Sequence, residues 1–177
     1  MKKWIHTVML FLVCFVLILS GCGTNEEDHS QGTLTEAALS EELVQNNEEI
    51  LFSFAIDEMP RYASLCRDEN NDYIVFRFGT SKALTTEVFE TRENKGNIFE
   101  YDHYFRGNIR PEFRIDDNHL VFEYDGLEFE LFDTEAAGED REVGLIVTNK
   151  AENRSETFTA VESTLIGNLL FFRYDYD

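Results

Sequence analysis

From residue 73 onward, apolar side chains recur at every second position in short runs that turn-forming residues separate. A period of two places alternate side chains on opposite faces of an extended chain, so each run predicts a β-strand with one face toward a core. No helical pattern lies between the runs, which favours antiparallel pairing over parallel βαβ units. The runs cover residues 73–78, 84–91, 98–105, 112–115, 120–124, 127–132, 142–148, 156–161 and 165–174.

The clearest pair of runs lies within residues 120–131, on the two sides of Asp125-Gly126. An Asp-Gly pair between alternating runs is a strong signal for a type I′ hairpin turn. Clusters of turn-forming residues predict further turns at residues 93–96 and 116–118. The hairpin turns its glutamates to water and keeps one apolar face, made of Leu120, Phe122, Tyr124, Leu127, Phe129 and Leu131.

Residues 34–58 carry a different pattern. Thr33 and Glu36 have the spacing of a helix capping box. Residues 50–56 also alternate as a strand would, but we expect a helix over 34–58 that has a weak point in its middle and ends before Pro60. One face of this helix would hold Leu39, Leu43, Ile50 and Phe54.

These elements together predict an α+β fold. One N-terminal helix is followed by a mostly antiparallel β meander, and this meander is arranged as a curved sheet, a barrel or a sandwich. The alternation of the strands is compatible with all three arrangements.

The chain begins with Lys2-Lys3 and an apolar segment at residues 5–19, which is shorter than the roughly 20 residues of a membrane-spanning helix. The segment leads into Leu19-Ser20-Gly21-Cys22. This stretch resembles the signal peptides of bacterial lipoproteins and fits their lipobox at each position. The resemblance implies a diacylglyceryl group on the sulfur of Cys22, cleavage before Cys22, and anchoring to the extracytoplasmic face of the cell membrane.

This resemblance and the composition of the chain predict a division into three segments. Residues 1–21 would be the signal peptide, residues 22–32 are polar and acidic and predict a flexible stalk, and residues 33–177 have the length of a single domain. The chain has 35 acidic and 15 basic residues, a net charge of −20, and loss of the signal peptide would lower this charge to −22. Nucleic acid is therefore not an expected partner.

The candidate binding residues are Arg106, Arg110 and Arg114, spaced four apart around a glycine and a proline. Guanidinium groups bind carboxylates and phosphates through paired hydrogen bonds, so a loop of this kind would suit an anionic ligand or an envelope protein. The competing interpretation is that these arginines pair with some of the many carboxylates of the chain.

Residues for catalysis or metal binding are few. Asp102 or His103 could approach His119 across two strands to hold zinc, but alternation places Asp102 and His103 on opposite faces. Cys66 is the one cysteine outside the N-terminal stretch and is expected to be a small core residue. We therefore expect no catalytic residue, no metal and no cofactor.

The function expected from these observations is a membrane-anchored, non-enzymatic binding or interaction module. Two alternatives stay open. The many Phe and Tyr residues could line a β-barrel cavity that carries a hydrophobic ligand. A pair of the abundant carboxylates could instead hydrolyse a cell-wall polymer.

Overall fold

The computed structural model describes residues 43–80, 82–107 and 110–174. All of them belong to the unit Leu34–Asp177. The predicted signal peptide, the lipidation site at Cys22 and the stalk lie outside the described residues, as do positions 34–42 of the predicted helix.

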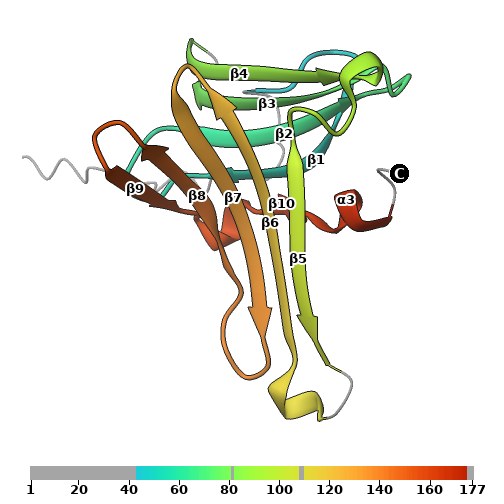
Figure 1. Ribbon diagram of the computed structural model, residues 1–177, viewed down its shortest axis with the longest axis vertical. Helices are drawn as coiled ribbons and strands as arrows, with labels where there is room; N and C mark the ends of the chain where they lie inside the picture. The colour runs from blue at the N-terminus through green and yellow to red at the C-terminus, as the bar shows by residue number, and fades with distance from the viewer. Residues whose placement is uncertain (1–42, 81, 108–109, 175–177) are drawn as a thin grey trace, which may run out of the picture. The chain divides into compact units, whose positions relative to one another are not determined.

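The first sheet is an antiparallel meander of four strands that is extended by a short fifth strand from the end of the chain (Figure 1). The short strand β10 pairs with β1, so the sheet has the order β10-β1-β2-β3-β4. The strands are β1 Glu48–Ala55, β2 Tyr62–Asp68, β3 Tyr73–Thr80, β4 Ala83–Thr91 and β10 Ile166–Gly167.

The second sheet is a continuous antiparallel meander with the order β5-β6-β7-β8-β9. Short 3-10 turns and one five-residue α-helix connect or follow the strands of the two sheets. The strands are β5 Glu100–Arg106, β6 Ile115–Tyr124, β7 Leu127–Ala136, β8 Glu142–Asn149 and β9 Arg154–Thr159. The turns and the helix are η1 Arg92–Asn94, η2 Pro111–Phe113, η3 Glu162–Thr164 and α3 Leu170–Tyr174.

Aromatic rings from both sheets meet in one hydrophobic core. The ring centroids of Phe76 in β3 and Phe122 in β6 are 4.8 Å apart, and Phe122 stacks on Phe129 of β7 at 5.3 Å. Phe78 contacts Phe158 at 5.5 Å near the other end of the interface. Since two separate sheets bury their facing side chains against each other, the described residues form a β-sandwich.

The expected α+β class is wrong. Residues 48–55 of the predicted helix form β1, which pairs with β2 along its whole length and with β10 on its other side. The apolar positions of this segment fit both the helical period of 3.6 and the strand period of two. The segment forms a strand because every second side chain from Phe52 to Ile56 then enters the core between the sheets. Within the described residues, α3 is the only α-helix, and the architecture is nearly all β.

The hairpin at Asp125-Gly126 is confirmed. Both residues have positive φ, 50° and 75°, as a type I′ turn requires. The register pairs Phe122 with Phe129 and Leu120 with Leu131, and these four side chains of the predicted apolar face are buried in the core. Nearer the turn, Leu127 is partly buried and Tyr124 is exposed.

Three other local predictions are wrong. The run predicted at 112–115 does not form a strand of its own, because the 3-10 turn η2 takes up residues 112 and 113 and β6 begins at Ile115. Residues 116–118 lie inside β6 instead of forming a turn. The run at 165–174 divides into β10 and α3 instead of forming one strand.

Candidate functional site

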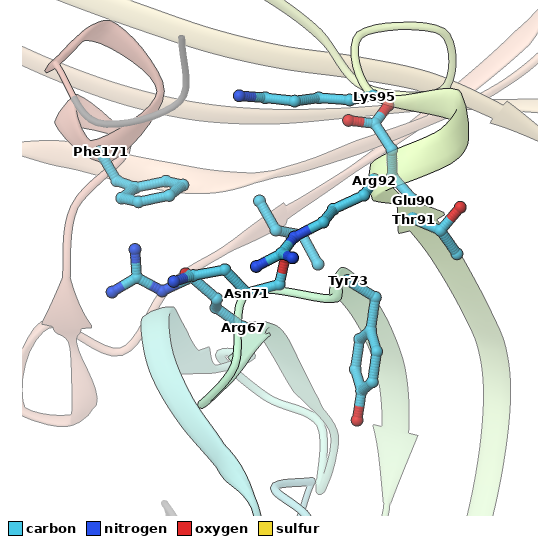
Figure 2. Close-up of a pocket in the computed structure, with 9 residues that line it drawn as sticks. Arg67, Asn71, Tyr73, Glu90, Thr91, Arg92, Lys95 and Phe171 are labelled. Atoms are coloured by element: carbon cyan, nitrogen blue, oxygen red, sulfur yellow. The ribbon is translucent and has the colours of Figure 1, made fainter.

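A hollow of about 300 Å³ opens beside the β2–β3 turn, where η1 and α3 also come close (Figure 2). Three of its side chains are cationic, which is notable in a chain with a net charge of −20. The residues that line it are Arg67, Asn71, Tyr73, Ile74, Glu90, Thr91, Arg92, Lys95 and Phe171.

Arg67 reaches the hollow from β2, where its side chain is about one quarter exposed. Its guanidinium carbon lies 4.8 Å from the ring centroid of Phe171, beneath the ring in Figure 2. One of its terminal nitrogens pairs with the Glu49 carboxylate on β1. A guanidinium has five N–H donors, so these two contacts leave Arg67 with donors for a ligand.

Arg92 comes from η1 and binds the turn that joins β2 to β3. Its Nε donates to the carbonyl of Asn71 at 2.7 Å, and Nη2 donates to the carbonyl of Asn70. Its Nη1 lies 3.5 Å from Asp72. Arg92 therefore holds two elements together on one side of the hollow and is itself held in a defined place.

The side chain of Asp68 stabilises the same turn through hydrogen bonds. Its carboxylate is buried and accepts the backbone N–H of Asn70 at 2.8 Å and the side-chain amide of Asn47 at 2.8 Å. Asn71 follows with a positive φ of 59°, a conformation that asparagine tolerates better than most residues. The Asn71 carbonyl that Arg92 binds is thus fixed by the local sequence.

Glu90 also lines the hollow and is 2% exposed. Its carboxylate accepts three backbone N–H groups, from Gly96 at 3.0 Å and from Ile98 and Phe99 at 2.8 Å each. These bonds bend the segment after η1 over the end of the first sheet. The bend places Lys95 at the hollow, with its side chain extended toward Phe171 in Figure 2.

The lining of the hollow carries three cationic groups and one carboxylate, that of Glu90, whose charge is already met by three N–H donors. Such a site can bind a carboxylate or a phosphate through charge-assisted hydrogen bonds. Phe171 adds an apolar wall against which the rest of a ligand can pack.

The structure separates the three arginines expected from the sequence. Arg106 and Arg110 line a second hollow of about 510 Å³ together with Phe113, whose carbonyl accepts a 3.2 Å hydrogen bond from Arg106 Nε. Arg114 instead lies 3.9 Å from Asp116 and 3.8 Å from Glu135. A role for this set in binding a ligand stays a prediction.

The histidines considered for zinc face opposite sides of the second sheet. Asp102 lies opposite His119 in the β5–β6 register, whereas His103 lies opposite Asn118. His119 contacts two carboxylates, Asp117 at 3.1 Å and Glu130 at 2.7 Å. Among the described residues, no group of three or more potential metal ligands comes together.

A polar cluster that the sequence did not reveal lies on the core face of the second sheet. Asp133 is buried and forms a two-pronged ion pair with Arg141, at 2.6 and 2.7 Å. The same carboxylate accepts the N–H of Leu169 at 3.2 Å, and Arg141 donates to the carbonyl of Gly167. This cluster therefore fastens the chain between β10 and α3 to the second sheet.

Comparisons of the chain with protein-family models, with curated proteins and with solved structures find no match. Within the described part of the chain, no helix has the length and apolar character needed to cross a membrane. By its fold and its site, the protein is an antiparallel two-sheet sandwich with a cationic surface hollow.

Proposed function

We propose that this protein is a non-enzymatic binding module that holds the carboxylate or phosphate group of a ligand in the cationic hollow. The observation that carries the proposal is the convergence of Arg67, Arg92 and Lys95 from three different elements of a strongly acidic chain. An acidic surface repels anions at long range, so attraction of an anion needs a local excess of positive charge.

The geometry supports binding rather than simple charge neutralisation. Arg92 and Lys95 stand on a segment that the buried Glu90 carboxylate fixes, and Arg67 is packed under Phe171. Because the two guanidinium groups and the backbone that carries Lys95 are held before a ligand arrives, less conformational entropy is lost on binding. The partly exposed guanidinium of Arg67 faces the same hollow as Lys95.

We also propose that the module is tethered to the outer face of the cell membrane through a lipid on Cys22. The support is the stretch Leu19-Ser20-Gly21-Cys22 with the preceding lysines and apolar segment. A Cys22→Ser chain should leave the membrane fraction and lack the acyl mass that the parent chain carries. Membrane association that survives this substitution would contradict the tether.

Titration of the full-length chain with inorganic phosphate, pyrophosphate and citrate tests the hollow. We expect saturable heat release or NMR shifts for at least one of these anions, with affinity falling as salt rises. The variants Lys95→Ala and Arg67→Ala should each weaken that binding by about tenfold, since a charge-assisted hydrogen bond contributes about 1.5–3 kcal/mol.

Lys82→Ala is the matched control because it removes the same charge from an exposed position outside the hollow. Its affinity should stay within about twofold of the parent value. Equal losses in Lys82→Ala and Lys95→Ala would mean that only the overall charge matters. That result, or no binding of any of the three anions, would overturn the proposed site.

The hydrophobic-ligand carrier and the wall-polymer hydrolase stay predictions. The carrier hypothesis needs aromatic side chains around a cavity, whereas Phe76, Phe122 and Phe129 contact one another in the core. The surface hollow therefore supports the binding module better than it supports either alternative.

A further inference from the structure

Strand β5 is an open edge of the second sheet. It is the first strand in the order β5-β6-β7-β8-β9, and β6 is its one strand neighbour in the described part of the chain. Figure 1 shows it as the outermost strand of that sheet. None of its seven residues is buried, and the aromatic side chains of Tyr104 and Phe105 are exposed.

Two features that often protect an edge strand, a β-bulge and a proline, are missing here. The β5–β6 register runs without a bulge from Glu100 to Arg106, and the strand contains no proline. Across the described residues, no backbone group of β5 hydrogen bonds to anything but β6. A regular, unpaired edge of this length is a template for pairing with another strand.

The helix α3 packs on the core-facing side of β5 rather than along its edge. Phe172 stacks on Tyr101 at 5.8 Å, and the guanidinium of Arg173 lies 5.4 Å from the ring of Phe105. Tyr101 also donates a hydrogen bond to Asn118 of β6, which confirms the side on which these rings lie. The hydrogen-bonding groups of the edge thus stay accessible.

The sequence of β5 is complementary to itself when read in the antiparallel direction. In Glu-Tyr-Asp-His-Tyr-Phe-Arg, a two-fold axis through His103 places Glu100 opposite Arg106 of a second copy. The same register sets Tyr101 opposite Phe105, and it keeps every pair on one face of the sheet because paired positions differ by an even number. Opposite charges and aromatic pairs are the combinations that stabilise neighbouring strands.

The two terminal charges face no opposite charge inside the described part of the protomer, where Arg106 Nε donates only to the Phe113 carbonyl. Glu100 lies opposite Val121 and Arg106 opposite Ile115 in β6, so neither faces an opposite charge across the strand pair. Among the described residues, neither side chain forms an ion pair. The other long edge, β4, carries two glutamates and no basic residue, and it lacks such complementarity.

We propose that two copies of this chain associate through their β5 strands, antiparallel and centred on His103, so that their second sheets join into one continuous sheet. The interface is isologous, with each copy contributing the same strand. Each dimer holds two Glu100–Arg106 pairs, one on either side of the two-fold axis.

Disulfide trapping in the full-length chain tests this register. His103→Cys places two thiols directly opposite each other, at a Cβ separation that a disulfide can bridge. On oxidation it should give a covalent dimer well above the background from the native cysteines in the parent chain. Glu69→Cys is the control, since it puts an exposed thiol in the β2–β3 turn, and it should not exceed that background.

Charge reversal in the His103→Cys chain tests the terminal pairs. Glu100→Arg or Arg106→Glu alone places like charges opposite each other twice per dimer, and we expect the rate of cross-linking to fall at least about tenfold. The double variant Glu100→Arg/Arg106→Glu restores both pairs and should return the rate to within about twofold of the starting value.

Mixing the two single variants provides a check that does not depend on the folding of the double variant. In the mixed dimer, each contact again joins opposite charges, so cross-links should form between unlike chains although each chain alone forms few. Failure of both the double variant and the mixture to recover would overturn the proposal. Rapid cross-linking of Glu69→Cys would overturn it as well, because random collision would then explain the dimer.

Discussion

Arg77 and Glu48 form an ion pair in which both side chains are almost completely removed from solvent, at 2% and 0% exposure. Nη1 and Nη2 of Arg77 donate to the two carboxylate oxygens at 2.6 and 2.9 Å. Tyr73 and the backbone of Gln45 also donate to this carboxylate. Burial by itself raises the pKa of Glu48, but these hydrogen bonds lower it by more, so the pKa lies below its ordinary value.

Glu48→Ala should destabilise the fold by about 3–5 kcal/mol, because it leaves the Arg77 guanidinium buried without its main counter-ion. Glu49→Ala is the matched control, since the next residue pairs with Arg67 at the surface and its side chain is 52% exposed. We expect Glu49→Ala to lower the free energy of unfolding by less than about 1 kcal/mol. Urea unfolding followed by circular dichroism measures both values, and similar losses would show that the buried pair has no special role.

Glu90→Gln should lower the stability by about 2–3 kcal/mol, since an amide replaces a carboxylate that accepts three N–H groups. The amide hydrogens of Gly96, Ile98 and Phe99 should exchange faster with solvent. Hydrogen exchange measured by NMR can follow these three amides directly. Glu93→Gln, an exposed change in η1, serves as the control and should leave their exchange unaltered.

His119 should make the stability depend on pH near neutrality. Partial burial by itself lowers the pKa of His119, but the hydrogen bonds to Asp117 and Glu130 outweigh this effect and hold the pKa above 6.5. The folded state therefore binds the proton more tightly than the unfolded state does. The stabilisation is fully present below about pH 6.5 and is lost as the pH rises through the higher native value.

The measurement is urea unfolding of the parent and His119→Gln chains at pH 6 and pH 8.5. At pH 6 the parent should have a higher free energy of unfolding than the variant, and most of this difference should vanish at pH 8.5. In an NMR titration, the pKa of His119 should fall when Asp117→Asn and Glu130→Gln are combined. A free-energy difference that is the same at both pH values would contradict the assignment.

Cys66 should resist alkylation in the folded protein. It is fully buried, its Sγ lies 3.0 Å from the Ser64 hydroxyl, and burial raises the pKa of its thiol to about 11. At pH 8, roughly one thiol in a thousand would be ionised, and access is blocked as well. Iodoacetamide labelling read by peptide mass mapping should modify Cys66 in urea and spare it in buffer. Equal labelling in both conditions would place Cys66 at an open surface.

A local pattern predicted the hairpin at Asp125-Gly126 because a tight turn depends on neighbouring residues. The Asp125-Gly126 turn and its register follow from two positive φ values and from simple alternation. The segment at 48–55 was assigned to the wrong class because its apolar positions fit both periods, and the choice depends on β2, β10 and the facing sheet, which are distant in sequence. The division into two sheets depends on equally distant contacts.

The candidate site was harder to predict for the same reason. The sequence pointed to Arg106, Arg110 and Arg114 because three arginines lie within nine residues. In the structure they line two different hollows. Arg67, Arg92 and Lys95 carry no local motif, and only the packing of β2, η1 and the segment after it brings them together. The buried Arg77 lies in a run of strand-forming residues, and alternation alone does not show that its face of β3 is covered.

The pairing of β10 with β1 affects the order in which the polypeptide can fold. Most strand pairs join neighbours along the chain, so they can form while synthesis continues. The pairing of Phe52 with Gly167, and the hydrogen bond from the N–H of Asn168 to the carbonyl of Leu51, must wait for the last part of the chain. A chain that stalls or is cut before Ile166 would leave the middle of the β1 edge, around Leu51 to Ser53, without its strand partner, and the nascent protein is then most vulnerable to aggregation and proteolysis.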